Sequence, residues 1–391
     1  MEKFERVIWV VLDSVGIGAL PDAADYEDTG RSTLGHIADA RALQLPNLVK
    51  LGLGNIAPLK HLPAVPNPAA SFGKGATYSP GKDTTTGHWE MAGVWLDQAF
   101  PVYKQGFPAE IMEAFEAQIG RKTIGNKPAS GTEIIKELGE EQVRTRKPIV
   151  YTSGDSVFQI AAHEDVIPIG ELYRMCEIAR KLLDGKHRVG RVIARPFTGT
   201  SGHFTRTSHR HDYAVDPPRP MLLDVLQECR VPVFGIGKIH DIYNGRGVDE
   251  YVTTKSNADG MEKLSAATRE RKRGLIFCNL VDFDMLYGHR KDVEGFACSL
   301  EEFDAALSTY LPLLGDRDLL MLTADHGCDP DPRWETTDHS REYVPILAFA
   351  PAQSQGKSLG TRATLADMGQ TIAETFGGKI PHGTSFLKQL P

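Results

Sequence analysis

The hydrophobic residues of the chain gather in short runs that are rich in Val, Ile, Leu and Phe. Runs of this kind are typical of strands that are buried on both faces of a sheet. Other stretches repeat an apolar residue every three or four positions, as the buried side of a helix does. The predicted strands are 6–12, 149–151, 190–194, 231–236, 274–281, 318–323 and 343–349, and the clearest predicted helices are 218–229, 257–272 and 299–314. Strands that alternate with helices predict the α/β class.

The length of the chain predicts two domains, because 391 residues exceed the roughly 250–300 at which a single core stops growing. Proline and glycine cluster near 98–108 and 216–220. Between these clusters the chain is rich in Arg and His and has few carboxylates in metal-like settings. We therefore expect residues 99–218 to form a smaller, inserted domain. Residues 1–98 and 219–391 would then form one discontinuous core domain.

Charge and cysteine content exclude several classes of protein. The formal net charge is −7, from 44 Lys and Arg against 51 Asp and Glu, whereas nucleic acids and anionic membranes attract a basic stripe. The apolar run 6–12 is followed at once by Asp13, and it is too short for a membrane span or a signal peptide. Five cysteines without a C-x-x-C pair indicate reduced thiols. We expect a cytoplasmic protein with neither nucleic acid nor membrane as partner.

Carboxylates and histidines follow several predicted strands directly, at the end where open α/β sheets bind their ligands. A divalent cation needs several such groups together, because a lone buried carboxylate is costly to desolvate. The candidate ligands are Asp13, Asp284, His289, Asp325, His326 and His339. Oxygen and imidazole donors without a thiolate suit Mn²⁺, Mg²⁺ or Zn²⁺, and the mixture favours Mn²⁺ or Zn²⁺. Each residue alone has an ordinary alternative, such as a helix cap, a turn or an exposed loop histidine, but their joint occurrence favours a two-metal site.

The segment GKDTTTGHWEMAG (81–93) places three threonines between a Pro-Gly turn and a predicted helix. A helix N-terminus binds anions, and a hydroxyl there becomes a nucleophile when a metal activates it. Thr84, Thr85 and Thr86 all remain candidates on this chemistry, and the alternative is a helix-capping threonine. We interpret His88 and Trp89 as packing behind the threonines.

Nine motifs together resemble the phosphopentomutase family of the alkaline phosphatase superfamily. They are VVLDSVGIGALPDA, GKDTTTGHWEMAG, YTSGDSVFQIAAHE, RVIARPFTG, HFTRTSHRHDYA, GIGKIHDI, NLVDFDMLYGHR, TADHGCDP and TDHSREYVPIL. TADHG followed by TDH is shared across the superfamily, whereas GKDTxTGHWE and SGDSVFQIA are particular to the mutases. The resemblance implies a central, mostly parallel sheet between helices, with an inserted smaller α/β cap domain.

The resemblance also implies a role for each site residue. Asp13, Asp325 and His326 match the ligands of one manganese, and Asp284, His289 and His339 match those of the other. Thr84 matches the threonine that becomes phosphorylated, while the position of Thr85 tolerates residues without a hydroxyl. Asp155 matches a partner for sugar hydroxyls. The loop between Asp325 and His339 is slightly longer than in relatives and lacks the histidines that some of them carry.

Further positive charge is expected to bind the phosphate that is not reacting, because arginine offers a planar fork of donors. The candidates are Arg191, Arg195, Arg206, Arg210, His211 and Lys238. We retain Arg195, Arg206 and Lys238 with Asp155 as the substrate-binding set. For each arginine the alternative is a solvated surface charge.

The implied activity is the interconversion of ribose or deoxyribose 1-phosphate and 5-phosphate by a monomer, in nucleoside catabolism. A sugar bisphosphate such as glucose 1,6-bisphosphate would serve as activator. A phosphatase or a cofactor-independent phosphoglycerate mutase of the same superfamily is an alternative, although KDTTTGHWE disfavours the latter. A non-enzymatic metal-binding protein is the third hypothesis.

Overall fold

The computed structural model describes residues 4–154, 156–218, 220–352 and 355–390. The chain divides into two compact units, Met1–Ala99 with Pro217–Pro391, and Phe100–Asp216. The predicted insertion, 99–218, begins one residue earlier and ends two residues later than the second unit. No helix in the described part of the chain is long and apolar enough to cross a membrane.

The first unit is built on a sheet in the order β10-β9-β11-β1-β12-β13-β2-β14. Its strands are β1 (Arg6–Leu12), β2 (Ser71–Gly75), β9 (Val233–Ile236), β10 (Glu250–Val252), β11 (Gly274–Leu280), β12 (Asp318–Thr323), β13 (Val344–Phe349) and β14 (Ser358–Arg362). From β10 to β12 all neighbours are parallel, and β13 runs antiparallel to β12 and β2. Every residue of β1, β11 and β12 is buried, as expected for strands that are covered on both faces.

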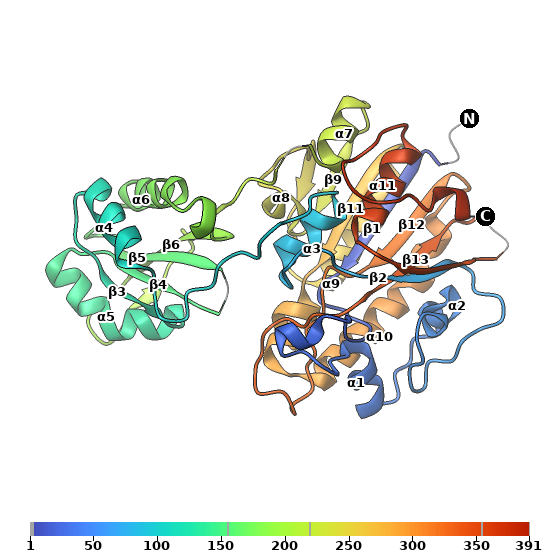
Figure 1. Ribbon diagram of the computed structural model, residues 1–391, viewed down its shortest axis with the longest axis horizontal. Coiled ribbons are helices and arrows are strands. Elements are labelled where there is room, and N and C mark those ends of the chain that lie inside the picture. Colours follow the sequence, from blue (N-terminus) through green and yellow to red (C-terminus); the bar gives the residue numbers. More distant parts are fainter. Residues whose placement is uncertain (1–3, 155, 219, 353–354, 391) are drawn as a thin grey trace. The chain divides into compact units, whose positions relative to one another are not determined.

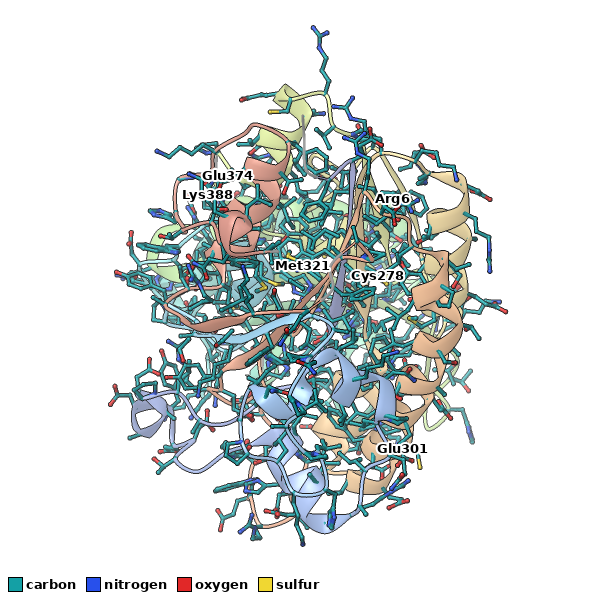
Figure 2. All side chains as sticks on the ribbon, turned by 90° about the vertical axis from the view of Figure 1, so that its right-hand side faces the viewer. Arg6, Cys278, Glu301, Met321, Glu374 and Lys388 are labelled. Atoms are coloured by element: carbon teal, nitrogen blue, oxygen red, sulfur yellow. The ribbon has the colours of Figure 1, made fainter. Side chains whose placement is uncertain are left out.

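Helices cover both faces of this sheet (Figure 1). They are α1 (Thr33–Ala40), α2 (Pro46–Leu51), α3 (Thr84–Met91), α7 (Leu222–Glu228), α8 (Ile239–Ile242), α9 (Asn257–Glu270), α10 (Val293–Tyr310) and α11 (Ala366–Thr375). Figure 2 shows Cys278 of β11 and Met321 of β12 between α11, which carries Glu374, and α10, which carries Glu301. The α/β class predicted from the sequence is therefore confirmed.

The register of the central strands brings three chain segments together. Leu12, the last residue of β1, pairs with Leu280, the last residue of β11, and Val11 pairs with Thr323 of β12. Because the three strands are parallel, the residues that follow them emerge at the same edge of the sheet. After β11 the chain turns through a π-helical segment, Phe283–Tyr287, and a 3₁₀ segment, Gly288–Arg290.

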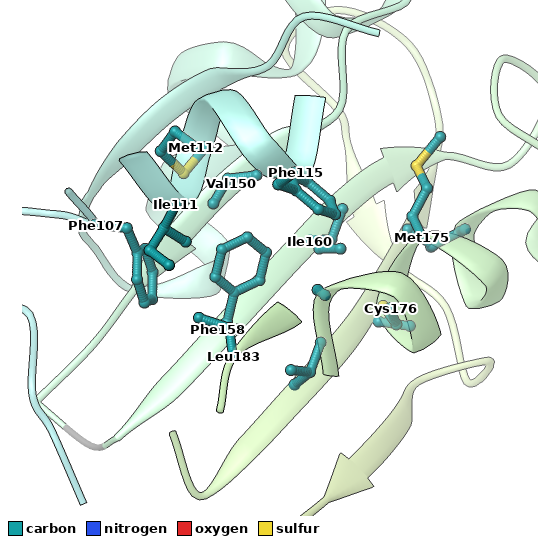
Figure 3. Close-up of a cluster of buried hydrophobic side chains, with 14 of the residues drawn as sticks. Phe107, Ile111, Met112, Phe115, Val150, Phe158, Ile160, Met175, Cys176 and Leu183 are labelled. Carbon is teal, nitrogen blue, oxygen red and sulfur yellow. The ribbon is translucent and has the colours of Figure 1, made fainter. Parts of the chain in front are cut away.

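The second unit has its own sheet, in the order β3-β4-β5-β6-β7 with β8 beside β6. Its elements are α4 (Ala109–Ile119), β3 (Ile124–Pro128), α5 (Gly131–Thr145), β4 (Ile149–Thr152), β5 (Val157–His163), α6 (Ile169–Leu182), β6 (Arg191–Thr198), β7 (Thr205–Arg206) and β8 (His211–Ala214). Phe115 of α4 and Cys176 of α6 pack with Val150 in one core (Figure 3). The neighbours of Val150 in β4, Ile149 and Tyr151, pack with residues of α5 in a second core, since side chains alternate along a strand.

Several elements differ from the sequence predictions. Helix α10 begins at Val293, where the Asp292 side chain accepts a hydrogen bond from the Gly295 amide, six residues before the predicted start. The prediction missed β2 and β14, because their sequences SFGKG and SLGTR lack a continuous apolar run. It also missed β5, VFQIAAH, whose glutamine and histidine interrupt the apolar pattern.

Candidate active site

Donor atoms of seven residues converge at the shared edge of the main sheet. Three groups each hold their donor atoms within 4.8 Å of one another: Asp13, Asp325 and His326; Asp284, His326 and His339; and Asp284, His289 and Cys328. The six predicted ligands are therefore brought together. Cys328 was missed, because a single cysteine in TADHGCDP gives no signal of its own in the sequence.

The distances between donor atoms suit cations shared by several ligands. His326 Nε2 lies 3.5 Å from Asp13 Oδ1 and 3.3 Å from Asp325 Oδ2. Asp284 lies 3.2 Å from His339 Nε2 through one oxygen and 3.4 Å from His289 Nε2 through the other. These side chains are buried apart from the half-buried His289. The two sets that the resemblance implies therefore lie side by side.

Three buried carboxylate oxygens of this cluster lie 3.1–3.5 Å from histidine ring nitrogens but make no well-aligned hydrogen bond within the described residues. They are Asp13 Oδ1, Asp284 Oδ1 and Asp325 Oδ2. A buried carboxylate oxygen without a well-aligned donor is costly, and one cation beside Asp13 and Asp325 with a second beside Asp284 would satisfy these oxygens. The oxygen and imidazole donors therefore fit two divalent cations.

The pKa values of residues in the cluster are shifted in the direction that favours positive charge. Burial, together with the charges of Asp325 and Asp284, raises the pKa of Asp13 well above its ordinary value. Burial acts to lower the pKa of His289, but hydrogen bonds with Asp284 and Cys328, together with the charges of these two groups, outweigh this and raise that pKa to about 12. The cluster thus favours added positive charge, which divalent cations would supply.

Buried neighbours hold the candidate ligands in place. Asn279 Nδ2 donates to Asp13 Oδ2 at 3.0 Å and lies 3.4 Å from His88 Nε2. The other ring nitrogen of His88 lies 3.1 Å from Asp325 Oδ2. His289 Nδ1 lies 2.7 Å from the Thr337 carbonyl oxygen, which leaves Nε2 directed at Asp284. Such contacts behind the ligands fix their orientation.

The threonine segment places one hydroxyl at the ligand cluster. Thr84 is the first residue of α3, and its Oγ1 lies 3.2 Å from His326 Nε2. Thr86 instead donates its hydroxyl to the capping residue Asp83 at 2.5 Å. A Cβ atom on Gly87 would lie 2.3 Å from the Asp325 carbonyl oxygen, so only glycine lets α3 approach this closely.

Within the main unit, the remaining predicted residues divide into neighbours of the ligands and structural groups. Lys238 caps α8, and its charge acts to lower the pKa of Asp13. Trp89 is buried and donates to the Ile242 carbonyl.

In the second unit, positive charge gathers near the N-terminus of α5. Burial raises the pKa of Tyr151, while Arg195 and Arg206 act to lower it. The Tyr151 hydroxyl makes no hydrogen bond within the described residues. A Cβ on Gly131, the first residue of α5, would lie 2.7 Å from this hydroxyl and 3.5 Å from Arg206 Nη1. Arginine, hydroxyl and helix N-terminus are the groups that bind phosphate.

Other predicted phosphate ligands of this unit have partners of their own. Arg210 donates to Asp212 through two nitrogens, at 2.7 and 2.6 Å, and Arg191 lies 3.6 Å from the same carboxylate. His211 stacks edge-on against Tyr213. These contacts favour a structural role for all three. Asp155 lies outside the described residues.

Comparison with known proteins agrees with this fold and ligand cluster. Residues 5–380 match the family model of the Metalloenzyme superfamily, so the chain is a member of that class. It is 57% identical over 388 residues to the phosphopentomutase of Desulfitobacterium hafniense, covering 99% of this chain and 100% of the relative. It is 56% identical over 388 residues to the phosphopentomutase of Caldanaerobacter subterraneus, covering 99% and 98%. The chain belongs to the phosphopentomutase family.

A solved structure shares the fold at much lower sequence identity. The protein PH0037 of Pyrococcus horikoshii matches 98% of this chain and 100% of its own, with a TM-score of 0.50 and 14% identity. At that identity the likeness supports the fold alone.

Proposed function

We propose that this chain interconverts the 1-phosphate and 5-phosphate of ribose or deoxyribose as a metal-dependent phosphopentomutase. The observation that carries the proposal is the position of Thr84 Oγ1, 3.2 Å from His326 Nε2 within the cluster of candidate ligands. The curated relatives, at 55–57% identity, carry the name of this activity.

In this proposal, Asp13, Asp325 and His326 hold one Mn²⁺, and Asp284, His289 and His339 hold the other. Mg²⁺ or Zn²⁺ would substitute, because oxygen and imidazole donors accept all three. When bound, the two cations supply charge neutralisation for the oxygens of a phosphoryl group in transfer. The carboxylate oxygens of the cluster that lack a well-aligned hydrogen bond support this assignment.

Thr84 is the proposed carrier of the phosphoryl group. The bond between phosphorus and Thr84 Oγ1 breaks as a free sugar hydroxyl attacks, which gives a pentose bisphosphate. The sugar then turns, and its other phosphoryl group returns to Thr84. Thr84 lies at the N-terminus of α3, where an anion is favoured. A sugar bisphosphate such as glucose 1,6-bisphosphate would phosphorylate Thr84 initially.

The proposed substrate ligands are Lys238, Asp155, Arg195 and Arg206. Lys238 lies close enough to Asp13 to act on its pKa, and its charge would attract a phosphate. The arginines, with the Tyr151 hydroxyl, would bind the phosphate that is not reacting. We propose that residues 99–218 act as a cap that keeps water from the phosphothreonine.

The proposed setting is the cytoplasm, and the proposed active form is a monomer. Free cysteines throughout the described residues, with Cys176, Cys278 and Cys328 buried, are consistent with a reducing compartment. Light scattering of the purified protein tests the monomer.

A coupled assay tests the proposed function. The conversion of ribose 1-phosphate to ribose 5-phosphate is followed in Mn²⁺, with free phosphate measured in parallel. Thr84→Ala should lower turnover at least about 1,000-fold, since removal of a nucleophile abolishes the covalent route. The matched control, Thr85→Ala, should retain it. Stoichiometric phosphate release by the wild type would identify a hydrolase, and full turnover by Thr84→Ala would exclude the phosphothreonine.

A further inference from the structure

The loop before Thr84 is bound by one buried arginine from the metal-ligand loop. Arg341 is 3% exposed and lies two residues after His339. Its Nη1 donates to the carbonyls of Ser79 at 2.7 Å and Gly81 at 2.6 Å, and its Nη2 donates to the carbonyl of Thr77 at 2.9 Å.

The remaining donors of Arg341 are also used. Nη2 donates to Asp22 Oδ2 at 2.8 Å, and Nε lies 3.2 Å from both oxygens of the same carboxylate. Arginine has five N–H groups in a fixed plane, and these contacts account for all of them. The orientation of the guanidinium, and with it of the three carbonyls, is therefore strongly determined.

A buried glutamate binds the amides of the same loop. Glu90, in α3, accepts hydrogen bonds from the amides of Tyr78 at 2.8 Å and Ser79 at 2.7 Å. It also accepts from the hydroxyl of Thr364 at 2.7 Å, and it is fully buried. The segment 77–81 is thus bound through its carbonyls by a cation and through its amides by an anion.

We infer that Arg341 is a positioning residue that sets the location of Thr84 relative to the metal ligands. The inference rests on the proposed role of Thr84. Arg341 follows His339 closely in the chain, and Gly81, which it binds, precedes Thr84 by three residues. Through this link, the loop that carries one ligand and the loop that carries the nucleophile move together. A misplacement of about 1 Å costs on the order of 100-fold in rate.

Lysine cannot replace this arginine, because its ammonium is a single point charge on a flexible stem. Arg341→Lys keeps the charge but cannot bind three carbonyls in fixed directions. The matched control is Arg333→Lys, on the same loop, where Arg333 is exposed and pairs with Asp331. Both variants are compared with the wild type in Mn²⁺.

Two measurements test the inference. Hydrogen–deuterium exchange of residues 77–84 should be faster in Arg341→Lys and unchanged in Arg333→Lys. In the mutase assay, kcat of Arg341→Lys should fall about 10- to 100-fold, with KM for the pentose phosphate and the Mn²⁺ affinity within twofold of the wild type. A lower kcat with unchanged KM and Mn²⁺ affinity separates a positioning role from loss of the fold or of metal binding.

Each result that contradicts the inference is distinct from failure of the proposed function. Unchanged exchange at 77–84 overturns it whether or not the wild type has mutase activity, and faster exchange with unchanged kcat overturns the link to Thr84. A wild type without turnover refutes the proposed function instead. Should Arg341→Lys not fold, Asp22→Ala replaces it, because Asp22 is half-exposed yet holds the guanidinium. Asp22→Ala should also give faster exchange at residues 77–84 and a lower kcat, both by smaller amounts. Exchange and kcat equal to those of the wild type in this variant would overturn the inference.

Discussion

Replacement of Asn279 by alanine should weaken one of the two proposed Mn²⁺ sites without abolishing the other. Asn279 Nδ2 donates to Asp13 Oδ2 at 3.0 Å, and Asp13 groups with Asp325 and His326 but not with His289 or His339. Asn279→Ala therefore removes a hydrogen bond that orients Asp13, a member of only one of the groups of candidate ligands.

The size of the effect follows from the charge on Asp13. A hydrogen bond to a charged group contributes about 1.5–3 kcal/mol, and each 1.4 kcal/mol corresponds to about tenfold in affinity. We therefore expect the weakened site to bind Mn²⁺ about 10- to 100-fold less tightly, which agrees with the usual effect of removing a group behind a ligand.

Calorimetric titration of Mn²⁺ into the metal-free protein measures both sites. Asn55→Ala is the matched control, because Asn55 also hydrogen-bonds in the main unit, to the backbone of Val65 at 2.9 Å through both amide atoms. It should lower stability and leave both affinities unchanged. A folded Asn279→Ala protein with wild-type affinity at both sites would refute the reasoning, and equal weakening of both sites would refute the assignment of Asp13 to one.

The remaining predictions concern strain, charge and metal. Ser14 adopts φ 70°, which costs about 1–2 kcal/mol for a residue with a Cβ. Ser14→Gly should therefore unfold at an equal or higher urea concentration. A free energy of unfolding lower than that of the wild type by more than about 1 kcal/mol would contradict this. Burial acts to raise the pKa of Asp212, but hydrogen bonds from Arg210 and the charges of the neighbouring arginines together outweigh this and lower it below the ordinary 3.8. The ionised Asp212 therefore stabilises the fold above pH 3.8, and this stabilisation is lost as the pH falls through the folded-state pKa. In urea titrations, Asp212→Asn should lose less stability than the wild type on acidification. An equal loss in both proteins would exclude Asp212 as its source. Mn²⁺ at 100 times the dissociation constant of a site should raise the free energy of unfolding by about 2.7 kcal/mol for each site over chelator-treated protein, and equal melting curves would argue against metal binding by the native state.

Several candidate ligands could be predicted from the sequence because they follow an apolar run. Asp13 comes directly after a recognisable strand and Asp325 two residues after another, and parallel strands end at one edge of a sheet. His339 lies in a polar stretch, so its assignment depended on the resemblance to the family. Asn279 could not be found in this way, since it lies inside β11 and faces Asp13 only through the pairing of β1 with β11. Glu90 and Arg341 were missed because their partners include peptide groups of the loop 77–81, and such contacts leave no pattern in the sequence.

The strands and helices of the fold also differ in how well their own sequences predict them. Strands β1, β11 and β12 are covered on both faces, so their sequences are continuously apolar and predict them well. Strands β2 and β14 lie at one side of the sheet and contain glycine, so their positions depend on pairing with β13 and with each other rather than on their own composition. The start of α10 depends on a cap at Asp292, which lies before the amphipathic pattern becomes visible.

The manner in which Arg341 and Glu90 bind residues 77–81 has a consequence for divergence within the family. Both recognise main-chain atoms, which every residue type carries, so drift at an outward position such as Tyr78, which is 58% exposed, leaves the contacts intact. Substitution is constrained at Gly81, where a Cβ would lie 2.6 Å from Thr86 Oγ1. Orthologues should therefore vary at position 78 while keeping glycine at 81 and the two charged side chains, a pattern that alignment of distant members can check.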